Sequence, residues 1–293
     1  MKRFNYSFTT TVEFSKPVTE HSFTLRCLPA SRDAQEVWAQ VELDPATPGN
    51  LQRDSFGNTL VVGYIPQKHS HFTYHSFGTV VTGGAPGQVP NTVASIDPGA
   101  LHSGLVPGVP MMQEAASHGA PHPSFRFPSP LTQPSEGILE FARATGLEPG
   151  AAPLDDPAEL RAGCVELMRA IHDGLDYEPG STDVSTTAAE AFEQGCGVCQ
   201  DFTHIMIAVL RAWGLPARYA SGLTSGSGTT HAWAQTYVDG AWIGFDPTRD
   251  LEAGEDYLTL AVGRDWQDCP VERGTFHGTA DQTQTVFMRM EEQ

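Results

Sequence analysis

The sequence predicts an α+β protein, with an N-terminal antiparallel β-sandwich and a C-terminal core in which a buried helix packs on an antiparallel sheet. Two contrasts along the 293-residue chain predict this division. Short runs rich in Val, Thr, Phe and Tyr fill residues 1–84, whereas apolar residues at helical spacing begin only after Pro134. A Pro- and Gly-rich stretch, 85–134, separates the two parts and is expected to be a connector, so the second domain is 135–293.

Residues 1–84 are expected to form strands without an intervening helix. The runs HSFTLRCLPA, EVWAQVELDP, GNTLVVGYIP and HFTYHSFGTVVTG are rich in β-branched and aromatic residues and are bounded by Pro, Gly, Asn or Asp. Such a succession is typical of an antiparallel sandwich. The segment carries no candidate catalytic group, so we expect a domain with its own core that positions substrate or mediates self-association.

Three helices are expected after the connector. Ser135 is a candidate N-cap before GILEFARATG, and Gly146 ends that pattern. The stretch DDPAELRAGCVELMRAIHDGLDY has its apolar residues on one face. The third helix lies in GCGVCQDFTHIMIAVLRAWG, where apolar residues recur at helical spacing from Val198 until Gly214 ends the helix. Its strongly apolar side predicts a core helix.

Cys199 lies in the first turn of this third helix. A helix N-terminus presents unpaired N–H groups and a partial positive charge, which stabilise a thiolate. The position therefore makes Cys199 a candidate nucleophile. On position alone, a thiol that simply packs is an equal alternative.

The segment HAWAQTYVDGAWIGFDPT predicts a β-hairpin, because Asp239-Gly240 is a strong signal for a two-residue turn. With that turn Val238 faces Ala241, and His231 and Asp246 become diagonal neighbours on one face of the sheet. A three-residue loop without a bulge would place His231 and Asp246 on opposite faces. A His held by a carboxylate can accept the proton of a thiol and later protonate a leaving amine, so Cys199, His231 and Asp246 form a candidate catalytic triad.

GVCQDF at the start of an apolar helix, followed by HAW and then GFDPT, resembles the transglutaminase-like superfamily of papain-like thiol enzymes. YLTLAVGRDWQDCPVERGTF is similar to the tail of its bacterial members, and FTLRCLPASRDAQEVWAQVELDP and DSFGN to their N-terminal β region. The resemblance implies that Cys199 is the nucleophile, His231 the base and Asp246 the orienting carboxylate. It also implies attack on a peptide or carboxamide carbonyl through a thioester, as in a cysteine protease or amidase. Hydrolysis is the preferred outcome, and the alternatives are protein cross-linking onto an amine and a scaffold that keeps the fold without turnover.

Other residues near these motifs are weaker candidates. Gln200, Trp233, Trp242 and Tyr177 are candidate residues of the substrate cleft, and Tyr177 is also a candidate second donor to the oxyanion. Trp233 and Trp242 could instead simply cover the site. Cys196 makes a CxxC with Cys199, which allows a redox pair, although a small residue in a tight turn is the preferred interpretation and no second CxxC is present to complete a zinc site.

The charge and cysteine content of the chain indicate which classes of partner and which compartment to expect. A formal net charge of −18, from 35 acidic and 17 basic residues, argues against binding to nucleic acid or to anionic membranes. The sequence has no signal-peptide pattern and five sparse cysteines, so we expect a cytoplasmic protein. His69, His71 and His75 could bind a transition metal, but a solvated strand face is the more common arrangement, and we expect no metal and no cofactor. The expected partners are a peptide or protein substrate and a second copy of the chain, bound through the N-terminal domain.

Overall fold

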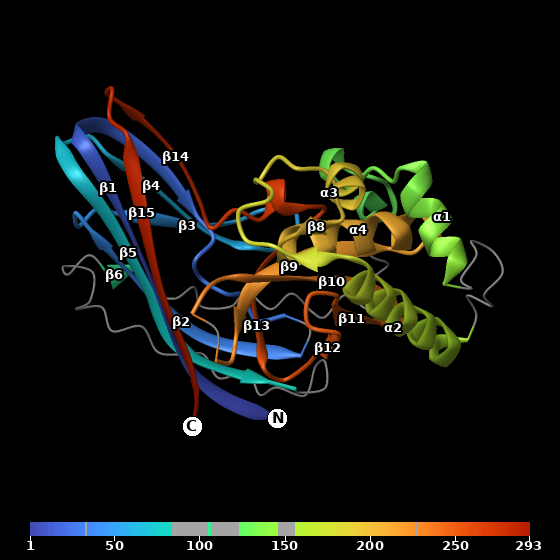
Figure 1. Cartoon of the computed structure of the whole chain (residues 1–293). Coiled ribbons are helices and arrows are strands. Elements are labelled where there is room, and N and C mark those ends of the chain that lie inside the picture. Colours follow the sequence, from blue (N-terminus) through green and yellow to red (C-terminus); the bar gives the residue numbers. More distant parts are fainter. Residues whose placement is uncertain (33, 84–104, 107–122, 146–155, 227) are drawn as a thin grey trace.

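The computed structural model describes residues 1–32, 34–83, 105–106, 123–145, 156–226 and 228–293 (Figure 1). Most of the expected connector lies outside these ranges, as does Gly146, the expected end of the first helix. The last part of the connector forms two short 3-10 helices, η2 (Pro123–Arg126) and η3 (Pro130–Thr132). Among the described residues, no helix combines the length and the apolar character that crossing a lipid bilayer requires.

The N-terminal half is built around one long strand, β1 (Lys2–Leu25), which belongs to two antiparallel sheets. An irregularity between Glu13 and Val18 divides the strand. Its first part pairs with β5 and β15, and β2 and β6 follow beyond β5. Its last part pairs with β4 and β14, and β3 follows beyond β4. The bounds of these strands are β2 (Gln35–Asp44), β3 (Gly49–Arg53), β4 (Thr59–Ile65), β5 (His69–Thr82), β6 (Leu105–Val106), β14 (Glu272–His277) and β15 (Gln282–Glu292).

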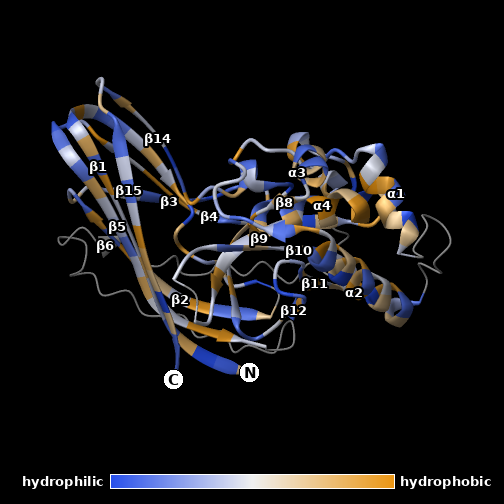
Figure 2. Cartoon of the chain, viewed as in Figure 1, coloured by the Kyte–Doolittle hydropathy of each residue, from blue (hydrophilic) through white to orange (hydrophobic). Residues whose placement is uncertain are grey.

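Aromatic side chains fill the space between these two sheets, which confirms the expected β-sandwich. Phe23 of the second sheet packs on Phe72 of the first, with ring centroids 4.7 Å apart. Phe14 and Phe276 make a similar contact at 5.0 Å. Buried and more exposed residues alternate along the first part of β1, which Figure 2 colours in hydrophobic and hydrophilic bands, as expected of a strand with one buried face.

The last two strands return to the N-terminal half of the molecule. Leu25 pairs with Glu272 in β14, and Phe4 pairs with Glu292 in β15. The expected catalytic domain, 135–293, is corrected in this respect, because its residues 272–292 complete the N-terminal sandwich. Neither strand carries a local signal for its partner, since pairing between distant segments depends on the whole fold.

The C-terminal half contains a five-stranded antiparallel sheet with the strand order β12-β11-β10-β9-β13. Helix α4 (Cys199–Ala212) packs on β9 and β10, and α1, α2 and α3 lie around α4 (Figure 1). Ile205, Met206 and Val209 of α4 are completely buried, and the expected core helix on an antiparallel sheet is confirmed. The strand bounds are β9 (Ala217–Thr224), β10 (His231–Val238), β11 (Ala241–Asp246), β12 (Leu251–Ala253) and β13 (Tyr257–Gly263).

The helices begin at residues whose side chains satisfy free backbone N–H groups. The Ser135 hydroxyl accepts from Ile138 N, as predicted, at the start of α1 (Glu136–Ala144). Asp156 caps α2 (Pro157–Gly174) in the same way. A short helix that the sequence did not predict, α3 (Ala188–Gln194), begins with a reciprocal pair of bonds between Thr187 and Glu190.

Candidate active site

The Cys199 thiol lies at the first residue of α4, as predicted. The preceding turn is held by the Asp201 carboxylate, which accepts hydrogen bonds from Val198 N at 2.8 Å and from the Thr182 hydroxyl at 2.6 Å. A Cβ atom at Gly197 would lie 2.7 Å from Asp201, so the turn requires glycine there. Cys199 is half-buried at the positive end of the helix, which is an environment that stabilises a thiolate.

His231 and Asp246 are brought together by the hairpin of β10 and β11. Asp239 and Gly240 both have positive φ, 47° and 81°, as a tight two-residue hairpin turn requires. Val238 pairs with Ala241, so the predicted register is confirmed. His231 Nε2 lies 2.6 Å from Asp246 Oδ2, and both side chains are buried.

The proton positions on His231 follow from its neighbours. An ionised carboxylate can only accept, so Nε2 donates to Asp246 and Nδ1 is left to face the thiol. Burial lowers the pKa of His231, but hydrogen bonds and negative charge from Asp246 and Cys199 outweigh burial and raise this pKa to about 9. The structure therefore brings the three predicted residues into one cluster with a thiol, an imidazole and a carboxylate in sequence.

Asp246 has further partners that the sequence did not reveal. The Tyr257 hydroxyl donates to Asp246 Oδ2 at 2.8 Å, and Thr248 N donates to Oδ1 at 3.1 Å. Arg249 Nε lies 3.9 Å from Oδ2. Burial, followed by the charge of Asp246, raises the pKa of Tyr257 well above its usual value, so its hydroxyl remains a donor. Tyr257 comes from β13, three strands away from β11, and no spacing in the sequence links the two.

The two tryptophans of the hairpin lie in different environments. Trp233 is 1% exposed, and its ring lies 5.1 Å from that of Tyr257 and 6.4 Å from that of His231, so it covers the buried side of the site. Trp242 packs instead against Phe125, with the Arg218 guanidinium 4.0 Å above its ring. Trp233 thus has the covering position that the sequence left open as an alternative, whereas Trp242 is only half-buried and stays a candidate cleft residue.

Tyr177 and Gln200 have different surroundings. Strand β7 (Asp176–Tyr177) pairs with β8 (Cys196–Gly197) and places Tyr177 beside Gly197, two residues before the nucleophile candidate. Tyr177 is 55% exposed; partial burial and then the charge of Cys199 raise its pKa, while Arg249 lowers it. Tyr177 is thus an exposed aromatic side chain next to the thiol. Gln200 is buried, and its side chain donates to Asp183 O at 3.4 Å rather than facing an opening.

The remaining candidate groups do not converge on a metal. Among the described residues, no group of three or more His, Cys, Asp or Glu side chains is arranged to hold an ion. His69 bonds to His21 at 3.1 Å, and His71 bonds to Asp44 at 3.1 Å. These two candidate metal ligands therefore have different hydrogen-bond partners. Cys196 and Cys199 are both free, half-buried thiols.

Two segments of the chain match known families. Residues 151–247 match the transglutaminase-like superfamily, and residues 4–81 match the bacterial transglutaminase-like N-terminal region. The chain thus contains a transglutaminase-like core and a bacterial transglutaminase-like N-terminal region. Cys199, His231 and Asp246 all lie inside the matched transglutaminase-like core, whereas Tyr257 lies beyond it.

A solved structure supports the fold of this transglutaminase-like chain. A candidate cysteine protease from Cytophaga hutchinsonii superposes with a TM-score of 0.69 over 99% of this chain and 90% of that chain, at 21% identity. At this identity the likeness establishes the fold. An uncharacterized protein of Mycobacterium leprae is 38% identical over 130 residues, which are 41% of this chain and 46% of the relative. An uncharacterized protein of Mycobacterium tuberculosis is 28% identical over 262 residues, covering 83% of this chain and 77% of the relative.

Proposed function

We propose that the protein catalyses thiol-dependent acyl transfer on peptide or carboxamide bonds, with hydrolysis as the preferred outcome. The observation that carries the proposal is the cluster of Cys199, His231 and Asp246. It combines a thiol at a helix N-terminus with an imidazole held at 2.6 Å by a buried carboxylate. Such a cluster serves as nucleophile, base and orienting group in thiol enzymes.

The first half of the reaction forms a thioester. The raised pKa of His231 favours a state in which the Cys199 proton already lies on the imidazole, and the resulting thiolate attacks the carbonyl carbon. The Cys199 N–H, one of the helix N–H groups without an intrahelical acceptor, stabilises the negative oxygen, and the proposed second donor is the Tyr177 hydroxyl. The C–N bond then breaks, and the amine leaves with the proton from His231.

The second half of the reaction releases the acyl group. His231 removes a proton from water, the resulting hydroxide attacks the thioester carbonyl, and the C–S bond breaks. The products are a carboxylic acid and the free thiol, which recovers its proton from His231. The likeness to the candidate cysteine protease of C. hutchinsonii favours water as the acceptor. If an amine replaces water, the same thioester gives a cross-link.

Capture of the acyl-enzyme tests this proposal. The wild-type protein and a Cys199→Ala variant are incubated with a peptide pool from a cell lysate in H₂¹⁸O, then quenched in acid and analysed by mass spectrometry. We expect a hydroxylamine-labile adduct on Cys199 in the wild type alone, together with peptides that gain one ¹⁸O in a new carboxylate. Added methylamine distinguishes the alternative, since cross-linking chemistry would yield methylamides in preference to acids. A wild-type protein without an adduct on Cys199 would favour a scaffold.

A further inference from the structure

The outer edge of the catalytic sheet is covered by the N-terminal domain. Among the described residues, strand β13 pairs with β9 on one side, and the N–H and C=O groups on its other side face no strand. Thr259 and Val262 on this strand are nevertheless buried. Buried backbone groups need hydrogen-bond partners, and here the partners are side-chain amides.

Gln35, the first residue of β2, pairs with the backbone of Thr259. Its Oε1 accepts from Thr259 N at 2.8 Å, and its Nε2 donates to Thr259 O at 2.8 Å. Nε2 also donates to Ala30 O at 2.8 Å. The amide thus takes the place of one residue of a neighbouring strand, and it does so from the N-terminal domain.

Asn58 makes the same arrangement with Val262. Its Oδ1 accepts from Val262 N at 2.8 Å, and its Nδ2 donates to Val262 O at 2.7 Å. Asp54 orients the amide, because its Oδ2 accepts from Asn58 Nδ2 and its Oδ1 from Asn58 N, both at 2.9 Å. Asn58 is completely buried, so this loop between β3 and β4 is fitted to β13 rather than resting loosely on it.

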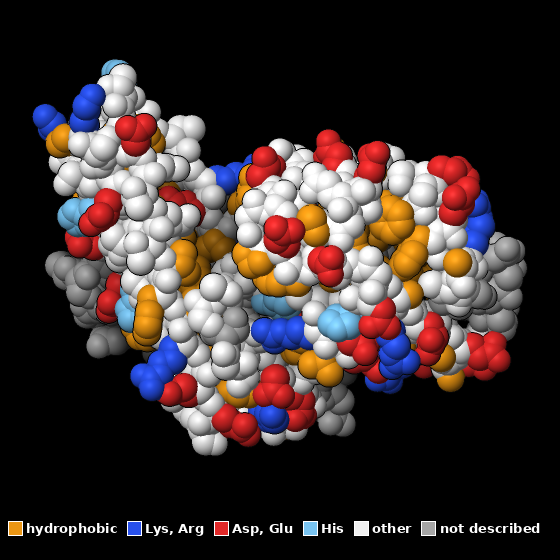
Figure 3. Space-filling model, viewed as in Figure 1, with side chains coloured by type: hydrophobic (Ala, Val, Ile, Leu, Met, Phe, Trp, Pro, Cys, Tyr) orange, Lys and Arg blue, Asp and Glu red, His pale blue; other side chains and the backbone are white. Residues whose placement is uncertain are grey.

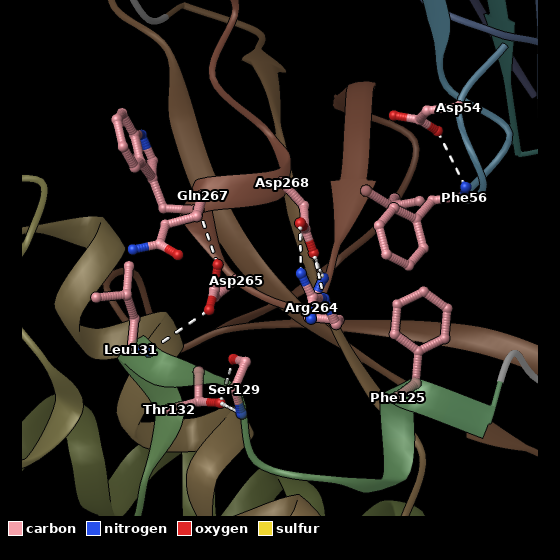
Figure 4. A network of polar contacts seen from close by, with 12 residues as sticks. Asp54, Phe56, Phe125, Ser129, Leu131, Thr132, Arg264, Asp265, Gln267 and Asp268 are labelled. Atoms are coloured by element: carbon pink, nitrogen blue, oxygen red, sulfur yellow. Dashed lines mark hydrogen bonds and ion pairs between the residues drawn. The ribbon is translucent and has the colours of Figure 1, made fainter.

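The tip of the same loop lies behind the candidate active site. Phe56 packs on the cluster that contains Trp233, Tyr257 and Val262. Figure 4 shows the Phe56 ring facing that of Phe125, and their centroids are 5.4 Å apart. The N-terminal domain therefore supports both the backbone of β13 and the aromatic layer that covers His231.

Strand β13 leads directly to the triad carboxylate. It begins at Tyr257, two residues before Thr259, and the Tyr257 hydroxyl donates to Asp246 Oδ2 at 2.8 Å. The turn before Tyr257 is also held by the N-terminal domain, since Lys2 Nζ lies 2.9 Å from Asp256 Oδ1. A continuous chain of contacts thus runs from the N-terminal domain through β13 to Asp246.

We infer that Gln35 and Asn58 are positioning residues of the active site, which hold β13 so that Tyr257 orients Asp246 against His231. This inference rests on the proposed function of Cys199, His231 and Asp246. It makes the N-terminal domain a structural part of the catalytic centre and not a separate substrate-binding module.

A double-mutant cycle on thiol reactivity tests the inference. The rate constant for alkylation of Cys199 by iodoacetamide, with the label mapped by mass spectrometry, is measured across a pH series for the wild type, Gln35→Met, Tyr257→Phe and the double variant. Gln40→Met is the matched control, because Gln40 is an exposed residue of the same strand. We expect each single variant to slow alkylation about fivefold or more and to alter the pH profile, since a loosened site loses its alignment. The double variant should be no slower than the slower single variant, and Gln40→Met should match the wild type.

The results separate positioning from general structural damage. Rates for Gln35→Met equal to those of Gln40→Met, or a double variant whose loss is the product of the two single losses, would overturn the inference. If Gln35→Met does not melt cooperatively, the same alkylation rates are measured for Asn58→Asp, which changes the side chain that binds Val262. The control is then Asn50→Asp, at an exposed residue of the same hairpin. Alkylation needs no amide substrate, so a wild-type Cys199 that reacts as an ordinary thiol would instead count against the proposed function.

Discussion

At Cys199, two features of the chain act on one sulfur atom. The N-terminus of α4 supplies a fixed partial positive charge, and His231 supplies a base whose orientation is set by Asp246. Each feature alone is common in structural sites, and a thiol can simply pack at a helix start. Their combination is the reason to expect nucleophilic chemistry at this residue.

The carboxylate of Asp246 should matter for rate more than for substrate binding. Asp246→Asn keeps the size of the side chain but removes the charge that stabilises the imidazolium. We expect kcat on a peptide amide to fall by about 10² to 10⁴-fold with little change in KM. Steady-state kinetics check this, and an unchanged kcat with an unchanged pH–rate profile would remove Asp246 from the triad.

The raised pKa of His231 predicts a pH-dependent contribution to stability. The folded state favours the protonated imidazole, with a pKa of about 9 against 6.5 for the ordinary side chain. The contribution is therefore complete below pH 6.5 and is lost as the pH rises through 9. We expect the free energy of unfolding of the wild type to fall by about 1–3 kcal/mol over this window relative to His231→Asn. Urea denaturation at several pH values measures it, and parallel curves for the two proteins would contradict the assignment.

At the scale of elements, the β10–β11 hairpin decides whether the site can form. A slip of one residue in its register would move Asp246 to the face opposite His231. The Asp239-Gly240 turn made this register predictable from sequence alone, and the apolar spacing of α4 did the same for the position of Cys199. These are local signals, and they account for the part of the site that was predicted.

Gly240 should be required for its backbone conformation and not for space. Its φ is 81°, and a Cβ there would meet no atom within 4 Å. We expect Gly240→Ala to lower the free energy of unfolding by about 1 kcal/mol, because an L-residue disfavours this conformation. Gly254→Ala is the matched control, since Gly254 is similarly uncrowded and has no positive φ. Equal denaturation midpoints for the two variants would show that the turn does not depend on this conformation.

Local sequence patterns could not predict other parts of the fold and of the site. Helix α3 has seven residues, too few to show a helical period. Tyr257 reaches Asp246 only because the sheet places β13 and β11 in one layer, and Gln35 reaches Thr259 across 224 positions of sequence. The packing of Trp242 on Phe125 likewise depends on a segment from the end of the connector.

On the scale of the whole molecule, the two halves are interlocked. The chain starts in the sandwich, forms the sheet of β9 to β13, and returns to β1 with β14 and β15 (Figure 1). Acidic side chains are scattered over the helical half in the face shown in Figure 3, in keeping with the net charge of −18. The sequence predicted a unit of residues 1–84 with its own core. In the structure, β1 of this unit also pairs with strands from the end of the chain.

Removal of the N-terminal half should destroy the remaining fold. A chain that begins at Pro123 would lack β1, so β14 and β15 would have no partner, and β13 would lose Gln35 and Asn58. We expect this chain to show no cooperative thermal transition by circular dichroism, because unpaired edges and exposed apolar surface favour aggregation. A cooperative melt, with Cys199 alkylated as fast as in the full chain, would mean that the C-terminal half folds alone.

The most direct test of the central claim compares two thiols in the same protein. Cys196 and Cys199 are both free and half-buried, but only Cys199 begins α4 next to His231. The rates at which iodoacetamide labels the two cysteines at about pH 6 are measured by peptide mapping in the wild type and in His231→Asn. We expect Cys199 to react at least about tenfold faster than Cys196 in the wild type, and at a similar rate to Cys196 in His231→Asn. Equal rates for the two cysteines in the wild type, or a fast Cys199 that does not respond to the loss of His231, would contradict the assignment of Cys199 as a nucleophile activated by His231.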